Sequence, residues 1–166
     1  MIILGIDPGS VRVGYGAIKK EGGKLIHIQS GLLDIPQDSK ENQLITLEKS
    51  LQNLITKIKP DLIGVERLYF VKNQKTALEV AQARGVIINV IAKFSIPFIE
   101  LSPSQVKQAV TGNGRASKKA VAKMINYFIN AKSLPAEFTT SKVIDDITDA
   151  LAIAITISNN KEFILL

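Results

Sequence analysis

The first nine residues constrain the fold most, because they contain a short apolar run that ends at a polar turn sequence. Residues 2–6 carry no polar side chain, and Asp7-Pro8-Gly9 follows at once. A run that short and apolar predicts a strand buried on both faces. Asp7 then stands where the strand leaves the sheet, a position at which α/β proteins keep catalytic groups. Asp-Pro-Gly is also an ordinary turn sequence, so a purely structural role for Asp7 stays open.

The length and residue usage restrict the class of protein. A chain of 166 residues is long enough to bury a core of its own. We expect a single domain over residues 1–158 and a loosely held tail over 159–166. The absence of cysteine excludes a disulfide framework and any Cys-ligated metal site. No apolar run is long enough to cross a membrane and no signal peptide is visible, so we expect a cytoplasmic protein.

The charge balance favours a polyanionic partner. Lys and Arg number 21 against 15 Asp and Glu, which gives a formal net charge of +6. Such a surplus on a small domain makes nucleic acid the first partner to consider and an anionic membrane surface the second. Net charge identifies neither by itself, so the positions of the charges must decide.

The first third of the chain predicts an antiparallel meander followed by a helix. Residues 11–18 alternate apolar and small or polar side chains, and residues 25–33 return as a strand after a turn at 20–24. Gly14 and Gly16 would lie near Asp7 across the ladder. They would allow a backbone or a ligand to approach the strand closely, or they mark a bulge. After a polar break at 36–40, leucines and isoleucines from Leu44 to Ile58 recur at helical spacing.

A second short apolar strand also ends in a carboxylate. Residues 61–66 repeat the pattern of the first strand and finish at Glu66. A strand reached through a crossover helix lies parallel to its neighbour, so if the two strands are adjacent, Glu66 and Asp7 leave the same edge of the sheet. The alternative is a surface acid that pairs with Arg67.

The rest of the chain predicts helices around one more strand. The expected strand, residues 95–101, contains Pro97, which favours an edge position. The helix at 73–93 is apolar on more than one side, so we expect two covers. One would be the sheet, and the other a partner subunit or another part of the same chain. The expected helices are 73–93, 103–110, 117–129 and 143–158.

The last helix supplies two more acids. Asp146 and Asp149 are three residues apart and therefore neighbours on one face. Asp145 and Asp146 also suit a first helical turn, where acids are favoured by the helix dipole. Asp149 precedes a mostly apolar run, where a bound cation would relieve the cost of a buried charge. Together with Asp7 and Glu66 these acids form an oxygen ligand set for Mg²⁺, with Mn²⁺ as a substitute. His27 has no nearby His or Cys and is interpreted as structural.

Two loops carry groups suited to nucleic acid. Residues 111–119 contain glycines and feed a helix N-terminus capped by Ser117, with Arg115, Lys118 and Lys119 at hand for phosphate. A solvated turn is the alternative. Tyr69 and Phe70, in front of Lys72, could stack on a base or pack into a core.

These motifs together resemble a known family, the RuvC-type Holliday-junction resolvases with the ribonuclease H-like fold. The resemblance covers nearly the whole chain in one order of motifs: GIDPG at 5–9, VERLYF at 65–70, Ala77-Leu78, QARGV at 82–86, SPSQVK at 102–107 and DITDALA at 146–152. It implies an α/β ribonuclease H-like fold, in which a five-stranded mixed sheet, an antiparallel three-strand meander plus parallel strands, is flanked by helices.

The resemblance also implies roles for particular residues. Two Mg²⁺ ions would be held by Asp7, Glu66, Asp146 and Asp149, with Lys107 and Lys118 near the scissile phosphate. Either Tyr69 or Phe70 would enter the junction. From the two loops themselves, Lys72, Arg115 and Lys119 are also expected to contact DNA. The long second helix would pack against its twin in a homodimer, and a branch-migration motor complex would be a partner. The implied activity is paired, symmetric nicking of a four-way DNA junction that leaves 5′-phosphate and 3′-hydroxyl ends, in recombination and repair.

Three other functions remain to be tested against this one. A ribonuclease H-like RNA-processing nuclease also begins with Asp-x-Gly and Arg-x-Gly, as Asp7 to Gly14 do here. An ATP-binding module of the actin and sugar-kinase type shares the Asp-x-Gly-Ser start, but its architecture needs two such domains. A non-catalytic junction-binding module would not need the intact carboxylates.

Overall fold

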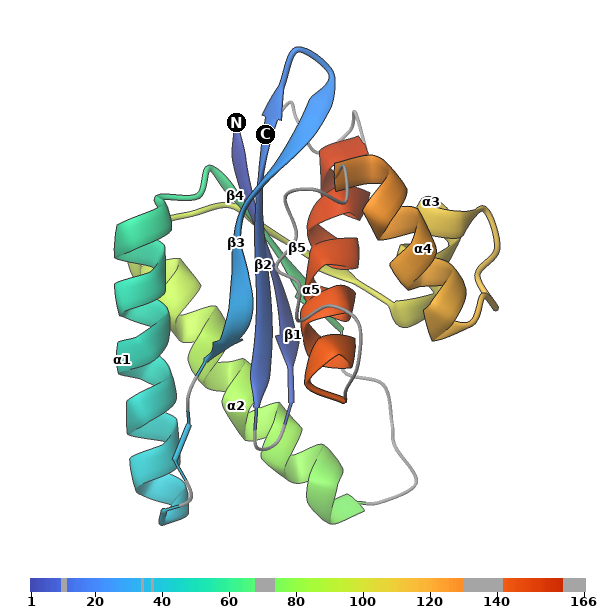
Figure 1. Ribbon diagram of the computed structural model, residues 1–166. Coiled ribbons are helices and arrows are strands. Elements are labelled where there is room, and N and C mark those ends of the chain that lie inside the picture. Colours follow the sequence, from blue (N-terminus) through green and yellow to red (C-terminus); the bar gives the residue numbers. More distant parts are fainter. Residues whose placement is uncertain (10–11, 34, 37, 68–73, 130–141, 160–166) are drawn as a thin grey trace.

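The fold is a five-stranded mixed sheet covered by helices on both faces (Figure 1). A computed structural model describes residues 1–9, 12–33, 35–36, 38–67, 74–129 and 142–159, the side chains of 74–75 and 142–144 excepted. The elements in chain order are β1 (Ile2–Pro8), β2 (Val13–Glu21), β3 (Lys24–Leu33), α1 (Lys40–Ile58), β4 (Leu62–Glu66), α2 (Gln74–Lys93), β5 (Phe98–Leu101), α3 (Pro103–Thr111), α4 (Lys118–Ile129) and α5 (Lys142–Asn159). The α/β class and the mixed sheet predicted from the sequence are confirmed.

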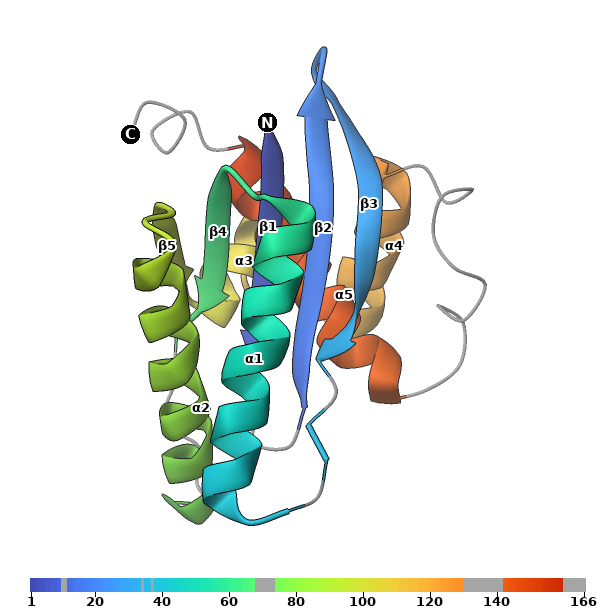
Figure 2. The ribbon, with the colours of Figure 1, turned by 90° about the vertical axis from the view of Figure 1, so that its left-hand side faces the viewer.

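The order of the strands is β3-β2-β1-β4-β5. β1 pairs antiparallel with β2 and parallel with β4, and β5 continues the parallel half at the edge of the sheet. The edge position expected from Pro97 is therefore confirmed. Because β1 and β4 are parallel neighbours, their carboxyl ends meet at one edge of the sheet. Seen from the side, α1 and α2 cover one face, while α5 covers the other with α3 and α4 outside it (Figures 1 and 2).

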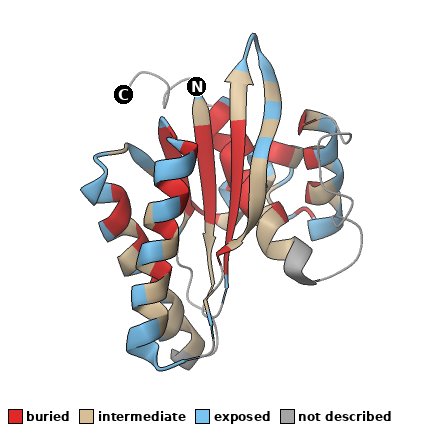
Figure 3. Cartoon of the chain, turned by 60° about the vertical axis from the view of Figure 1, so that its left-hand side comes forward, coloured by how far each residue is buried: buried red, intermediate tan, exposed pale blue. Residues whose placement is uncertain are grey.

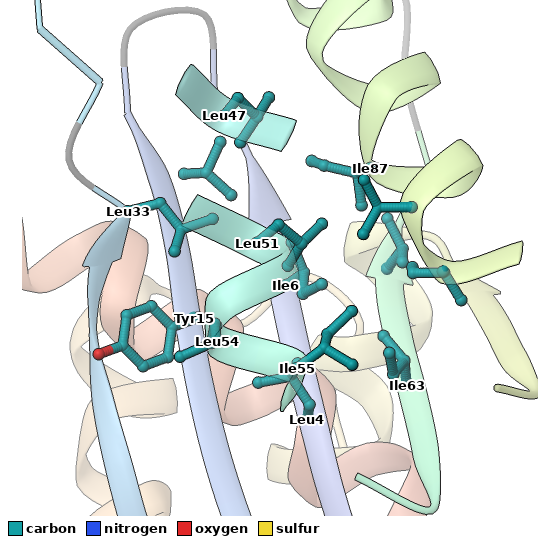
Figure 4. Packing of buried hydrophobic residues seen from close by; sticks show 14 of the residues in the cluster. Leu4, Ile6, Tyr15, Leu33, Leu47, Leu51, Leu54, Ile55, Ile63 and Ile87 are labelled. Atoms are coloured by element: carbon teal, nitrogen blue, oxygen red, sulfur yellow. The ribbon is translucent and has the colours of Figure 1, made fainter. Parts of the chain in front are cut away.

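Two apolar cores hold the layers together, one on each face of the sheet. Between the sheet and α1 and α2, leucine and isoleucine side chains from the helices meet the central strands (Figure 4). The second core joins the opposite face to α3, α4 and α5. Burial is concentrated in the central strands and in the helix stripes that face them (Figure 3). This rigid support fixes the positions of the side chains at the sheet edge.

Glycines in the strands allow α5 to lie directly on the sheet. A Cβ atom on Gly5 would come within 2.0 Å of the Ala150 carbonyl oxygen, and one on Gly14 within 2.2 Å of the Asp146 carbonyl oxygen. Any side chain at these positions would push the helix away from the strands. The close approach predicted for Gly14 is therefore present, and it brings the first turns of α5 over the end of β1.

Several boundaries differ from those expected. The turn between β2 and β3 is only Gly22-Gly23, with φ of 55° and 78°, so both strands extend further than the sequence predicted. α1 begins at Lys40 because the Ser39 side chain accepts a hydrogen bond from the Asn42 amide, so the expected polar break at 36–40 is shorter. β5 begins at Phe98, since Ser95 has φ of 54° and Pro97 has no amide hydrogen.

Other boundaries agree within one or two residues. α5 includes Asn159, so the helix enters the tail expected at 159–166, and residues 160–166 lie outside the described residues. Among the helices that the structure describes, none combines the length and the apolar character needed to cross a bilayer.

Candidate active site

Two carboxyl groups face each other at the end of the central strands. The register pairs Ile6 with Val65, which puts Asp7 and Glu66 side by side as the two strands leave the sheet. Their carboxyl groups lie within hydrogen-bonding reach of each other. Burial, followed by this contact and by the negative charges of Glu66, Asp149 and Asp146, raises the pKa of Asp7 to about 9. Burial also raises the pKa of Glu66. The shared edge predicted for these two residues is present.

Asp149 approaches the same place from α5. It is two turns into the helix, and burial raises its pKa although the nearby Lys118 ammonium opposes the shift. Lys118 Nζ lies 3.3 Å from Asp149 Oδ2 and 3.2 Å from Asp145 Oδ2. Burial lowers the pKa of Lys118, but the two aspartates outweigh that effect and raise it. Asp149 is thus close to Glu66 and carries a lysine as its counter-ion.

Asp146 lies over the start of β2, at the same edge of the sheet as Asp7. Its backbone rests on Gly14, which pairs with Asp7 across the ladder, and its charge acts on Asp7. Arg12 Nε is 3.6 Å from Asp146 Oδ2. This ion pair joins the β1–β2 loop to α5, and the sequence did not reveal it. The Asp-x-Gly and Arg-x-Gly spacing of residues 7–14 is the one signal that draws attention to Arg12.

A cavity of about 180 Å³ opens beside these carboxylates. Its lining includes the acids Glu66 and Asp149 and the bases Lys107 and Lys118, and Lys118 contacts Asp149 within it. Lys107 comes from α3, which starts at a full capping box between Ser102 and Gln105. The cavity therefore combines buried acids with two ammonium groups. The ammonium groups suit a phosphate, and the acids suit a hydrolytic centre beside it.

The remaining basic residues predicted for the site lie around it. The Ser117 hydroxyl accepts a hydrogen bond from the Ala120 amide, which confirms Ser117 as the cap of α4. Arg115 and Lys119 are exposed and do not line the cavity. Tyr69, Phe70 and Lys72 lie outside the described residues.

His27 is on β3, where its Nε2 is 2.9 Å from the Ser30 hydroxyl oxygen.

The acidic residues suit a hard divalent cation. Three carboxyl groups with raised pKa values share a small volume, and each would regain its charged form beside a cation. All the donors are oxygen atoms, which Mg²⁺ and Mn²⁺ prefer. In the described parts of the chain Asp7 contacts Glu66 and Asp149 contacts Lys118, and no three acids already form a closed ligand set. The donor chemistry therefore fits a metal centre in which Lys118 releases Asp149.

Comparisons with known proteins point to one family. The family model "Crossover junction endodeoxyribonuclease RuvC" matches residues 3–157. A protein of that description from Brachyspira hyodysenteriae is 42% identical over 166 residues, which cover 98% of each chain. One from Petrotoga mobilis is 41% identical over 155 residues, 93% of this chain and 91% of the relative.

Solved structures agree with the sequence relatives. The RuvC of Thermus thermophilus, described in complex with Holliday junction substrate, superimposes with a TM-score of 0.83 at 27% identity, covering 95% of this chain and 93% of the other. A yeast mitochondrial Holliday junction resolvase shares the fold, with a TM-score of 0.68 at 21% identity over 93% and 77% of the two chains.

The sheet order, the helices on both faces and the match to the Thermus thermophilus RuvC place the chain in the ribonuclease H-like class of resolvases. Within that class, the family model and the relatives fix the membership. The chain belongs to the RuvC family of crossover junction endodeoxyribonucleases.

Proposed function

We propose that this chain is a structure-selective endonuclease that resolves four-way DNA junctions by paired, symmetric nicks with 5′-phosphate and 3′-hydroxyl ends. The observation that carries the proposal is the pairing of Asp7 with Glu66 next to a cavity that also holds Asp149, Lys107 and Lys118. Buried acids and lysines converging on one cavity are the combination that phosphodiester hydrolysis needs. Membership of a family of crossover junction endodeoxyribonucleases is the reason for proposing the four-way junction as the substrate.

The residues in and beside the cavity have proposed tasks. Asp7, Glu66, Asp146 and Asp149 would hold the divalent cations, since the charges of the other three acids all act on Asp7. When bound, the cations would supply an activated water and charge stabilisation for the departing oxygen of the phosphodiester. Lys107 and Lys118, which line the same cavity, hold the phosphate oxygens. Lys118 leaves Asp149 and Asp145 when a phosphate arrives, and Arg12 keeps Asp146 oriented meanwhile.

The finer features of the proposal rest on the same family. Two Mg²⁺ ions per subunit are the expected cofactors, with Mn²⁺ as a substitute. Arg115, Lys119 and the segment with Tyr69, Phe70 and Lys72 are proposed to contact the junction. A homodimer provides two sites for two strands, with α2 as the interface, since Leu78 is 67% exposed on the side away from the sheet. Residues 1–158 would act as one nuclease domain in the cytoplasm, alongside a branch-migration motor complex.

The experiment compares a synthetic four-way junction with a linear duplex of the same sequence, with and without Mg²⁺, mapping cuts on all four strands. The wild type is expected to nick two opposed strands of the junction at symmetric positions, only with Mg²⁺. Asp7→Asn should lose at least about 100-fold in rate while binding the junction nearly as tightly, because the acid acts on the cations rather than on DNA affinity. Glu48→Gln, which changes an acid on α1 far from the cavity, should cut normally. Normal nicking by Asp7→Asn would remove Asp7 from the mechanism.

A ribonuclease H-like RNA-processing nuclease is the alternative that the Asp-x-Gly and Arg-x-Gly start favours. The same protein preparations should be offered a structured RNA. Faster cleavage of the RNA than of the junction would replace the proposed function with this one.

A further inference from the structure

The outer face of α4 is a basic surface that neither the cavity nor the core uses. Val121, Ile125 and Ile129 form the buried stripe of this helix, which packs on α5. On the opposite side, at helical spacing, lie Lys119, Lys123 and Tyr127. We call these three residues the α4 outer face.

The charges of α4 are not those of an ordinary solvated helix. The helix contains Lys118, Lys119 and Lys123 and no acidic residue. By contrast, α1 has Glu41 in its first turn and Lys57 in its last, as the helix dipole favours. Among the described side chains none forms an ion pair with Lys119 or Lys123. The α4 outer face therefore carries two lysines with no acid beside them in the helix, a local positive charge that suits an anionic partner.

Tyr127 is the second observation. Its side chain is 80% exposed, more than any other large apolar or aromatic residue in the described parts of the chain. Its ring is held by an edge contact with Phe128, at a centroid distance of 5.9 Å and an interplanar angle of 75°. Phe128 itself packs against the core. An exposed aromatic hydroxyl fixed on a basic surface is suited to contact a nucleic-acid backbone.

The position of α4 connects this surface to the active site. Lys118 begins the helix and lines the cavity with Glu66 and Asp149. α4 then runs away from that end along the outside of α5 (Figure 1). From Lys119 to Tyr127 the helix rises about 12 Å, which matches about three to four nucleotides along one strand.

We infer that the α4 outer face binds the sugar–phosphate backbone of one duplex arm of the junction, two to four nucleotides from the scissile phosphate. Lys123 neutralises a phosphate, and the Tyr127 hydroxyl donates a hydrogen bond to a phosphate oxygen. The bases of a duplex arm are stacked and unavailable to the ring, so the hydroxyl is the group that acts. This inference rests on the proposed function, since it takes the same junction as ligand.

The test measures binding of the metal-free protein to a four-way junction at a series of salt concentrations. Lys123→Gln should weaken binding about three- to tenfold near 0.1 M salt and reduce the slope of log affinity against log salt by about 0.9, the change for one lost phosphate contact. Tyr127→Phe should weaken binding about two- to tenfold, as Tyr127→Ala does, because both lose the hydroxyl. Lys49→Gln, an exposed lysine on α1 across the sheet, is the matched control and should change neither quantity.

A second arm of the experiment locates the contact. Neutral methylphosphonate linkages are placed two to four nucleotides from the cut on one strand, on each side in turn. On one side the modified junction should bind wild type and Lys123→Gln equally, because the phosphate that Lys123 contacts has lost its charge. A wild type that binds the junction while Lys123→Gln keeps its full salt slope would overturn the α4 contact alone. A wild type that does not prefer the junction would overturn the proposed function instead.

Discussion

Asp7 is the residue at which the demands of folding and of chemistry conflict most. Burial, the contact with Glu66 and two further aspartates raise its pKa to about 9. A carboxyl group in that position keeps its proton at neutral pH unless a cation offsets its charge. A cation bound beside Asp7 would offset that charge, so we expect the metal-free protein to be the less stable form above neutral pH.

This conflict predicts a pH-dependent stability difference for Asp7→Asn in metal-free protein. The folded-state pKa of about 9 exceeds the ordinary aspartate value of 3.8, so the stability that the Asp7 proton contributes is complete below about pH 4 and is lost as pH rises towards 9. The asparagine has no such loss. By pH 8 the variant should be more stable by at least about 1 kcal/mol, a rise in Tm of about 2–4 °C.

Thermal unfolding followed by circular dichroism in chelator, from pH 5 to 9, measures this difference. The two Tm profiles should diverge as pH rises, and added Mg²⁺ should narrow the gap by stabilising the wild type. Parallel Tm profiles would show that loss of the Asp7 proton does not destabilise the fold between pH 5 and 9.

At this scale the sequence predicts some contacts and not others. Asp7 and Glu66 each follow a short apolar strand, and a crossover helix lies between them, so their meeting could be foreseen. The pairs Arg12–Asp146 and Lys118–Asp145 could not. They depend on how the first turns of α5 are oriented relative to the β1–β2 loop and to α4. No local sequence pattern predicts that orientation.

Among the elements, α5 is the one whose placement decides the geometry of the site. It carries two of the proposed metal ligands, and glycines in β1 and β2 let it rest on the sheet backbone. Its helical character was readable from the sequence because the apolar run is long. Its distance from the strands was not, since that depends on small residues in other elements.

Gly14→Ala tests that dependence. The new Cβ would lie 2.2 Å from the Asp146 carbonyl oxygen, so the backbone of α5 must move. Gly64→Ala is the matched variant, because its nearest atom, 2.5 Å away, is a side-chain carbon of Ile153 and not the backbone of α5. Both should lose about 1–3 kcal/mol of stability. Only Gly14→Ala should also lose Mg²⁺-dependent junction nicking, by about tenfold or more at a temperature where both are folded. Equal nicking rates would show that the site tolerates a shift of α5.

The element boundaries that the sequence missed share a cause. Each was set by a backbone feature rather than by apolar periodicity: the two positive φ values at Gly22-Gly23, the Ser39 cap and the left-handed Ser95. Periodicity locates the middle of a helix or strand, where side chains are buried. Caps and turns determine where it stops.

For the whole molecule, the two faces of the sheet have different tasks. The face with α5 builds the cavity and the surrounding basic groups, while the other carries α1 and α2. Ala83, Ile87 and Val90 of α2 point into the core. On its opposite side Leu78, Ala81 and Gly85 are exposed, and a Cβ on Gly85 would touch nothing within 4 Å. Leucine beside small residues allows a second helix to approach closely, as the proposed dimer requires.

Leu78→Glu should therefore separate the proposed dimer. A carboxylate at the centre of a helix–helix contact is costly when buried against its own copy, so sedimentation at micromolar protein should give monomers where the wild type gives dimers. Ile45→Glu is the control, because Ile45 is 48% exposed on α1 and lies outside the proposed interface. Cleavage of a supercoiled plasmid with a cruciform reports the consequence: paired nicks give linear DNA and single nicks give open circles. Leu78→Glu should shift the product from linear to open-circle, whereas a monomeric wild type that still linearises the plasmid would exclude α2 as the source of paired cutting.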